Sequence, residues 1–242
     1  MLDIDARLRR AVKHFWTTRN RQASSQGRDS GAKDKGARSA VTGGAQMDGF
    51  IDLIHDFLIE TGAPSDCIMR NNDLQLPGWF RAEKNWDLVL VPRGELIAAI
   101  EFKSQVGPSF GNNFNNRTEE ALGSATDLWA AFREGAFRPS SRPWLGYLMM
   151  LEECERSMSP VAVREPHFDV FPEFKNASYE RRYALFIEKL IRDRLYDGGC
   201  FLLSRRSSVE SGDFKEPNGE LTFGRFMASL LGRVQAHIRT PK

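Results

Sequence analysis

Two acidic residues and a lysine near the middle of the chain have the types and spacing of a metal-dependent hydrolytic site. They are Asp87, Glu101 and Lys103, within the stretch NWDLVLVPRGELIAAIEFKSQ at 85–105. Two carboxylates suit a hard cation such as Mg²⁺, which takes few protein ligands and keeps several waters. Such a cation polarises a phosphodiester and helps to deprotonate a bound water, and a nearby lysine can stabilise the developing charge. An E-x-K tripeptide alone is common as a solvated ion pair, so the surrounding residues must show whether this one is catalytic.

The apolar runs on either side of P-R-G (92–94) predict a β-hairpin over residues 86–103. Proline suits the first position of a type I turn and glycine suits a left-handed third position, which favours a three-residue connection. Side chains alternate between the faces of a strand, so an odd number of connecting residues places Asp87 on the same face as Glu101 and Lys103. The hairpin therefore permits all three charges to meet.

The expected register sets Val91 opposite Glu95 and Asp87 opposite Ala99. Asp87 is then diagonal to Glu101, about 7–8 Å away at Cα, which is close enough for two carboxylates to share one ion. Both faces of the hairpin are apolar, which is typical of a central sheet covered by helices on each side. The charged face is expected to include Val89, Val91, Ile97 and Ala99, and the other face Leu88, Leu90, Leu96, Ala98 and Ile100.

The elements that must position this hairpin follow from hydrophobic periodicity along the chain. Strands alternating with helices indicate an α/β fold with a mixed, partly parallel central sheet flanked by helices. The whole chain, 1–242, is expected to form a single domain with its catalytic core at about 48–205. Helices are predicted at 3–20, 48–61, 118–135, 178–197 and 221–238, and further strands at 144–151 and 200–204.

Residues 20–46 are rich in Gly, Ser, Ala and basic side chains and have little to bury. This composition predicts a loop or arm, either a flexible linker or a basic segment that orders on DNA. Its basic residues, with the flanking Arg19, could contact a DNA backbone, as could Arg205 and Arg206 after the predicted strand at 200–204. The basic residues within the segment are Arg21, Arg28, Lys33, Lys35 and Arg38.

Composition excludes several other classes of protein. The chain has 242 residues, 41% hydrophobic and 27% charged, with a net charge of +2, as expected of an ordinary globular protein. Its three cysteines and four histidines are widely scattered, which argues against a disulfide framework and a zinc site. The first residues lack the apolar core of a secretory signal, and no apolar run approaches the roughly 20 residues of a membrane span. We therefore expect a cytoplasmic protein without membrane association.

The pattern of Asp87 followed by Glu101-Phe102-Lys103 on a hairpin resembles the PD-(D/E)xK nuclease core. More specifically, the chain resembles the XhoI family of type II restriction endonucleases across most of its length. The stretches NWDLVLVP, IAAIEFKSQVGPSFGNNFNNRTEEALG and GYLMMLEE carry the likeness, and the second is far more specific than the bare motif. Trp86 stands where the superfamily motif often has proline.

The resemblance implies a homodimer that uses Mg²⁺ to cut double-stranded DNA at the palindrome CTCGAG (C^TCGAG), leaving 5′-phosphate and 3′-hydroxyl ends, in defence against foreign DNA. It implies that Asp87 and Glu101 are metal ligands together with the backbone carbonyl of Phe102, and that Lys103 is the catalytic base-side group. Gln105 and Glu60 are weaker candidates for a supporting role, and a solvated helix end is the plainer interpretation of Glu60.

The stretch GNNFNNRTEE at 111–120 is the best candidate for reading DNA, since Asn can read adenine and Arg can read guanine in the major groove. Most of it falls in SQVGPSFGNNFNNR at 104–117, which we interpret as a polar loop before the helix at 118–135, although Asn-rich loops often serve only as turns and caps. The backbone amides after Arg117 could also hold a phosphate at the start of that helix. The candidate contacts are Asn112, Asn113, Asn115, Asn116 and Arg117.

Two other functions fit the same residues. A structure- or end-specific repair nuclease or junction resolvase would use the same three charges. A non-catalytic DNA-binding protein would carry a decayed site, and the intact Asp87, Glu101 and Lys103 argue against it.

Overall fold

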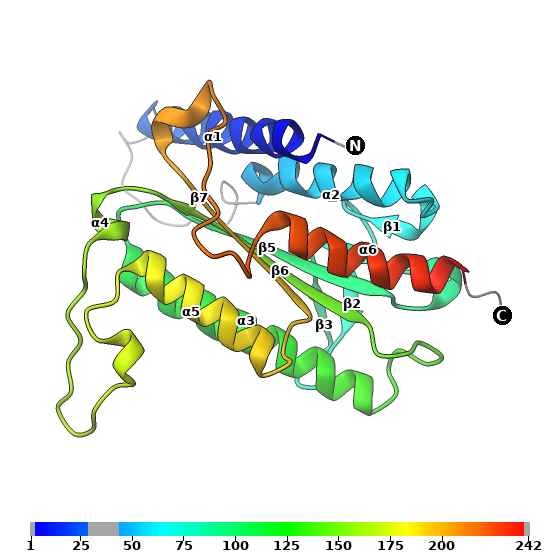
Figure 1. Cartoon of the computed structure of the whole chain (residues 1–242). Coiled ribbons are helices and arrows are strands. Elements are labelled where there is room, and N and C mark those ends of the chain that lie inside the picture. The colour runs from blue at the N-terminus through cyan, green and yellow to red at the C-terminus, as the bar shows by residue number, and fades with distance from the viewer. Residues whose placement is uncertain (1–2, 29–43, 240–242) are drawn as a thin grey trace.

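The computed structural model describes residues 3–28 and 44–239, which form three layers with a mixed β-sheet between two layers of helices (Figure 1). The sheet has five strands in the order β1-β4-β5-β6-β7. β1 pairs antiparallel with β4 and β4 with β5, whereas β5, β6 and β7 are parallel. The strands are β1 (Ile68–Met69), β4 (Leu88–Leu90), β5 (Ala98–Gln105), β6 (Trp144–Glu152) and β7 (Gly198–Ser204).

Helices α1, α2 and α6 cover one face of the sheet, and α3 and α5 cover the other (Figure 1). Each face has its own hydrophobic core, as expected of a sheet buried on both sides. Among the described residues, no helix combines the length and apolarity needed to cross a membrane. The helices are α1 (Ile4–Arg28), α2 (Asp48–Glu60), α3 (Phe110–Arg133), α4 (Glu155–Met158), α5 (Tyr179–Arg192) and α6 (Phe223–Arg239). The predicted fold class is confirmed.

The hairpin register differs by two residues from the one expected. Val89, not Asp87, lies opposite Ala99, and the regular pairing stops at Leu90 and Ala98. The connection is longer than three residues because Arg93 and Gly94 both take left-handed backbone angles, with φ of 53° and 76°, which leaves the segment after them outside the ladder. A shift of two preserves which face each side chain occupies. Asp87, Glu101 and Lys103 therefore share one face of the hairpin as expected, although the expected register is wrong.

Two side chains of this connection lie on the faces opposite to those predicted. Leu96 packs in the core beneath α3 and α5, and Ile97 packs in the core beneath α1, α2 and α6. Both precede the first residue of β5, Ala98, so the strict alternation of a strand does not apply to them.

The helix predicted at 118–135 begins eight residues earlier, at Phe110. Residues 110–117 of the predicted polar loop therefore form the first two turns of α3, and its first two residues, Ser104 and Gln105, end β5. Phe110 stacks on Tyr179 with ring centroids 5.6 Å apart, and Phe114 meets Tyr183 edge-on at 5.0 Å. This aromatic packing against α5 stabilises a helix through a stretch whose Gly and Asn residues have low helix propensity.

Two other predicted boundaries are wrong. α1 continues through Arg28, so the segment expected to be a loop from residue 20 starts as helix, and the part of that segment at 29–43 lies outside the described residues. Gly198 and Gly199 were expected to end a helix but begin β7 instead. They allow close packing there, since an added Cβ would lie 2.4 Å from Trp144 at the first position and 2.5 Å from Ile187 at the second.

A small second sheet, absent from the sequence prediction, leads into the hairpin. It consists of β2 (Gln75–Pro77) and β3 (Glu83–Asn85), paired antiparallel. The buried carboxylate of Asp127 on α3 fixes the turn between these strands. Its Oδ1 accepts hydrogen bonds of 2.7 Å from the backbone N–H groups of both Trp79 and Phe80, and its Oδ2 accepts one of 2.7 Å from Arg81 Nε. α3 thereby holds the segment that delivers Lys84 and Asp87.

Candidate active site

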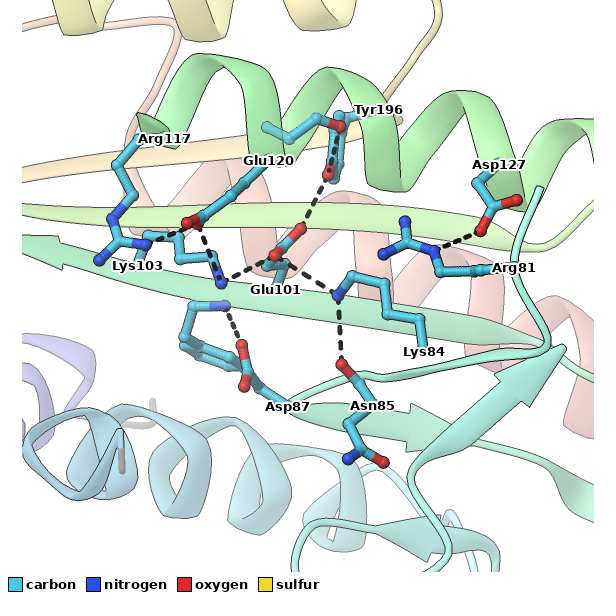
Figure 2. A network of polar contacts seen from close by, with 12 residues as sticks. Arg81, Lys84, Asn85, Asp87, Glu101, Lys103, Arg117, Glu120, Asp127 and Tyr196 are labelled. Atoms are coloured by element: carbon cyan, nitrogen blue, oxygen red, sulfur yellow. Dashed lines mark hydrogen bonds and ion pairs between the residues drawn. The ribbon is translucent and has the colours of Figure 1, made fainter. Parts of the chain in front are cut away.

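Asp87 lies directly before β4, at the edge where the small sheet joins the central one (Figure 2). Its backbone N–H donates to the carbonyl of Ile100 at 3.2 Å, which continues the hairpin pairing. Its carboxylate Oδ2 accepts a 2.7 Å hydrogen bond from the backbone N–H of Phe102. Extending the observed register by one residue sets Asp87 across from Glu101. The structure therefore brings the aspartate to the middle of the E-x-K tripeptide.

Glu101 is almost completely buried, with 1% of its surface exposed. Its Oε1 lies 2.8 Å from Lys103 Nζ and 3.4 Å from Lys84 Nζ. Its Oε2 accepts a 3.0 Å hydrogen bond from the hydroxyl of Tyr196, which also lies 3.2 Å from the carbonyl of Ala121 (Figure 2). A buried carboxylate is stable only when it is paired and hydrogen-bonded, and both oxygens of Glu101 meet that condition.

The pKa values of the site follow from burial and from the neighbouring charges. Burial raises the pKa of Asp87, and the positive charge of Lys103 only partly offsets it. Burial also acts to raise the pKa of Glu101, but Lys103 and Lys84 outweigh it and lower the pKa. Burial acts to lower the pKa of Lys103, but Glu101 and Asp87 outweigh it and raise the pKa. Lys103 is thus protonated in the metal-free site, as expected from its neighbours.

Lys84 is the exception among the cations, because burial lowers its pKa despite the attraction of Glu101. It projects from β3 and is 16% exposed at its side chain. The site therefore contains two lysines on one carboxylate, of which the sequence indicated one.

The polar network continues onto α3 (Figure 2). Glu120 Oε2 lies 3.8 Å from Lys103 Nζ and 2.6 Å from Arg117 Nη1. The Nε of Arg117 is buried and has no hydrogen-bond partner among the described residues. Of the five candidate DNA contacts, Arg117 is thus the one that reaches the charged cluster.

The asparagine candidates lie on the first two turns of α3 and contribute nothing to the charged cluster. Asn112, Asn115 and Asn116 are exposed, and Asn113 is half-buried. Residues three and four apart share a face of a helix, so the three exposed asparagines form one solvent-facing strip.

The two weaker candidates are held elsewhere. Gln105 is buried, its Oε1 accepts a short hydrogen bond from the hydroxyl of Tyr183, and its Nε2 donates to the carbonyl of Ser109 at 3.5 Å. Glu60 ends α2 and forms an ion pair of 2.6 Å with Arg7 of α1. In the described parts of the chain, neither side chain has a hydrogen bond or ion pair with Asp87, Glu101 or Lys103.

Three site residues escaped sequence reasoning for different reasons. Tyr196 is 95 positions from Glu101 and precedes a strand in no recognisable motif. Glu120 stands in the first turn of the helix predicted at 118–135, where acidic residues are common, and its proximity to Lys103 depends on the early start of α3. Lys84 stands three positions before Asp87 in a strand of three residues, too short for periodicity to detect. For Lys84 the signal available was its place in K-N-W-D, immediately before the motif.

The donor set fits Mg²⁺ better than a cation that needs many protein ligands. In residues 3–28 and 44–239, no group of three or more His, Cys, Asp or Glu side chains could hold a metal. Asp87 and Glu101 supply two carboxylates, and Mg²⁺ usually binds through one or two together with waters and substrate phosphates. Asp87 also lines a cavity of about 210 Å³ together with Phe102 and Asp48. Asp48 is the first residue of α2, and burial raises its pKa.

A second cavity, of about 700 Å³, opens between the C-terminal half of α3 and the segment after α5. Tyr196 lines it, but Asp87, Glu101 and Lys103 do not. Glu101 and Lys103 do not line the smaller cavity either, so we place the site by its chemistry, where Asp87, Glu101 and Lys103 come together.

The chain is similar to known proteins of one family. The family model described as "Restriction endonuclease XhoI" matches residues 26–216. The type II restriction enzyme BstVI of Geobacillus stearothermophilus is 52% identical over 220 residues, 89% of this chain and 95% of its own length. The type II restriction enzyme XhoI of Xanthomonas vasicola is 44% identical over 193 residues, 79% of this chain and 77% of its own.

A third relative, the type II restriction enzyme AbrI of Azospirillum brasilense, is 45% identical over 169 residues, 69% of this chain and 75% of its own length. No solved structure matches the chain.

Proposed function

The chain belongs to the XhoI family of type II restriction endonucleases, site-specific enzymes that cleave DNA, and from this we propose that it cuts the palindrome CTCGAG as C^TCGAG with Mg²⁺. The products would carry 5′-phosphate and 3′-hydroxyl ends, and the enzyme would act in the bacterial cytoplasm against foreign DNA. The observation that carries the proposal is the convergence of Asp87, Glu101 and Lys103 on one face of the hairpin.

In this proposal Asp87, Glu101 and the carbonyl of Phe102 hold Mg²⁺. When bound, the cation supplies a polarised phosphodiester and a more acidic water. Lys103 would orient the attacking water or, when protonated, stabilise the negative charge that develops on the phosphate oxygens. The 2.7 Å hydrogen bond from Phe102 keeps Asp87 aimed at the tripeptide. Tyr196 fixes the second oxygen of Glu101, which leaves Oε1 as the oxygen available to the metal.

We assign DNA recognition to the first two turns of α3. The major groove of B-DNA admits an α-helix, and its adenine edges accept bidentate contacts from asparagine. The exposed strip of Asn112, Asn115 and Asn116 has the geometry for such contacts, with Asn113 at its margin. Arg117 faces the charged cluster instead, so we assign it to a phosphate rather than to guanine. Gln105 has a supporting role, holding Tyr183 and the start of α3.

A two-fold target suits a two-fold enzyme, because each protomer can then present the same residues to each half-site. We therefore propose that the enzyme acts as a homodimer. Sedimentation of the protein with and without a duplex containing CTCGAG tests this state.

The decisive experiment incubates plasmid with the protein and Mg²⁺ and sequences the fragment ends. Discrete fragments that all end at C^TCGAG support the proposal. Discrete ends at another sequence would still indicate a restriction enzyme but would show that its target is not CTCGAG. Ragged loss from ends would favour a repair exonuclease, and binding without cutting a non-catalytic protein. The control is Asp87→Asn, which keeps the shape of the side chain but removes the charge that a metal requires.

A further inference from the structure

Lys84 is a partly buried lysine beside the charged cluster. Its Nζ lies 3.4 Å from Glu101 Oε1, donates a hydrogen bond of 3.2 Å to the carbonyl of Asn85, and lies 4.1 Å from the centre of the Trp86 ring. Lysine is rarely this enclosed unless it is paired. The cation–π contact and the ion pair together stabilise its ammonium group beside Glu101.

That position conflicts with metal binding. Both Lys84 and Lys103 contact the same oxygen of Glu101, Oε1, while Tyr196 occupies the other. A divalent cation at Oε1 would lie within a few ångströms of two ammonium groups in a poorly solvated site, where like charges repel strongly. At least one ammonium group must then move away.

Lys84 is the lysine with freedom to move. Lys103 lies on β5 two residues from Glu101, and β5 is paired along its length with β6. Lys84 comes from β3, a three-residue strand whose ladder partner is the three-residue β2. Its contact with Glu101 is also longer, 3.4 Å against 2.8 Å.

We infer that Lys84 is an exchangeable cation, which neutralises Glu101 in the metal-free protein, gives way when metal binds, and then pairs with the DNA backbone. The inference rests on the metal site of the proposed function. It makes Lys84 a positioning residue that couples metal to DNA. Without DNA, the ammonium group of Lys84 loses its ion pair with Glu101 when metal displaces it, and this cost weakens metal binding. With DNA, a backbone phosphate replaces Glu101 as the partner of Lys84. Such coupling is reciprocal, so metal must strengthen DNA binding by the same factor.

The test measures metal affinity rather than cleavage. Calorimetric titration with Ca²⁺, another hard cation bound by oxygen ligands, is carried out on the free protein and on its complex with a CTCGAG duplex, whose integrity is checked on a gel. The variants are Lys84→Met, which removes the charge, and Lys84→Arg, which keeps it. The control is Lys175→Met, which removes a surface lysine paired at 2.9 Å with a single glutamate, Glu165.

We expect free Lys84→Met to bind Ca²⁺ about fivefold more tightly than the wild type or more, the lower end of ordinary coupling strengths. Lys84→Arg and Lys175→Met should bind as the wild type does. On the DNA complex, the advantage of Lys84→Met should disappear. Equal or weaker binding by free Lys84→Met overturns the inference. Failure of every protein, wild type included, to bind Ca²⁺ in either state overturns the metal site itself.

A second measurement needs no change at Lys84. Because its ammonium group lies on the Trp86 ring, its departure should alter the fluorescence of that tryptophan. Saturating the wild type with Ca²⁺ should change the tryptophan emission, and Trp86→Phe should lose this change. If calorimetry shows saturation while the emission of Trp86 stays constant, Lys84 does not move and the inference fails. This measurement decides the matter even if Lys84→Met does not fold.

Discussion

The carboxylate of Asp87 accepts a 2.7 Å hydrogen bond from the backbone N–H of Phe102, the residue between Glu101 and Lys103. The bond connects the two halves of the hairpin at the three charged residues. It holds the aspartate in a buried position, where burial raises its pKa. The predictions below concern this arrangement and its supports.

Glu101→Gln should lower cleavage about 10³-fold or more, since a metal ligand contributes several kcal/mol to the transition state. Binding of a CTCGAG duplex should be largely kept. Glu101→Ala is a poorer test, because it leaves Lys84 and Lys103 without their shared carboxylate and should cost about 3 kcal/mol of stability. Single-turnover cleavage and urea unfolding separate the two effects. A Glu101→Gln enzyme that cuts at the wild-type rate would remove Glu101 from the metal site.

Lys103→Met should also abolish cleavage while leaving Ca²⁺ bound as tightly as before or more tightly. The lysine contributes positive charge beside the metal ligands, so its loss weakens the chemistry but not the attraction for a cation. Cleavage in Mg²⁺ and calorimetry in Ca²⁺ are compared on the same preparation. Loss of metal binding would assign Lys103 to the integrity of the fold.

Asp87→Asn should stabilise the metal-free protein at neutral pH while eliminating cleavage. Its pKa is raised in the folded state, so the folded protein prefers the neutral carboxyl, and stability falls as pH rises from the unfolded toward the folded pKa. An amide is neutral at every pH and can still accept from Phe102. Thermal unfolding from pH 3 to pH 8 should show the advantage of Asp87→Asn growing through that window and then levelling off. A lower melting temperature at pH 7 would contradict this.

Tyr196→Phe should shift the acidic limb of the cleavage profile to higher pH. The hydroxyl donates to Glu101 and helps to lower its pKa, so removing it raises the pH at which this ligand ionises. The rate at high pH should change much less. Trp129→Phe, on the same flank of α3 but outside the charged network, serves as the control. An unchanged profile for Tyr196→Phe would mean that Lys103 and Lys84 alone determine the ionisation of Glu101.

Asp127→Ala should cost about 1–3 kcal/mol of stability, because it removes the acceptor for the N–H groups of Trp79 and Phe80 and the partner of Arg81. The pKa of Asp127 is lowered in the folded state, so its contribution is present above the unfolded pKa and is lost as pH falls through the folded one. Urea unfolding at pH 7 and pH 3 should therefore show a larger difference from the wild type at pH 7. Equal differences at both values would mean that its charge is unimportant.

The fold class and the face shared by Asp87, Glu101 and Lys103 could be predicted from the sequence, because both depend on hydrophobic periodicity. A register error of an even number of residues does not change the face that a side chain occupies. It failed on the register, since that depends on the left-handed angle of Arg93, which an arginine seldom adopts. It also failed on the start of α3, where contacts of Phe110 and Phe114 with α5 override local propensity.

The partners of Glu101 illustrate a different limit. Lys103 is two positions away and could be inferred from alternation along a strand. Tyr196 and Lys84 reach the same carboxylate from other elements, and single-sequence reasoning cannot tell which distant side chains will surround a buried charge. Residues that act through packing of separate elements were therefore the ones that it missed.

β5 is paired along all eight of its residues with β6, and its first three residues are also paired with β4. Moving Glu101 or Lys103 relative to the rest of the sheet would break the ladder with β6, so these two residues resist displacement. The outward strip of α3 faces solvent and has no such constraint. Because we propose that this strip reads the target, new specificities should be sought by randomising it and leaving the strand unchanged, since substitutions on the two elements have very different structural costs.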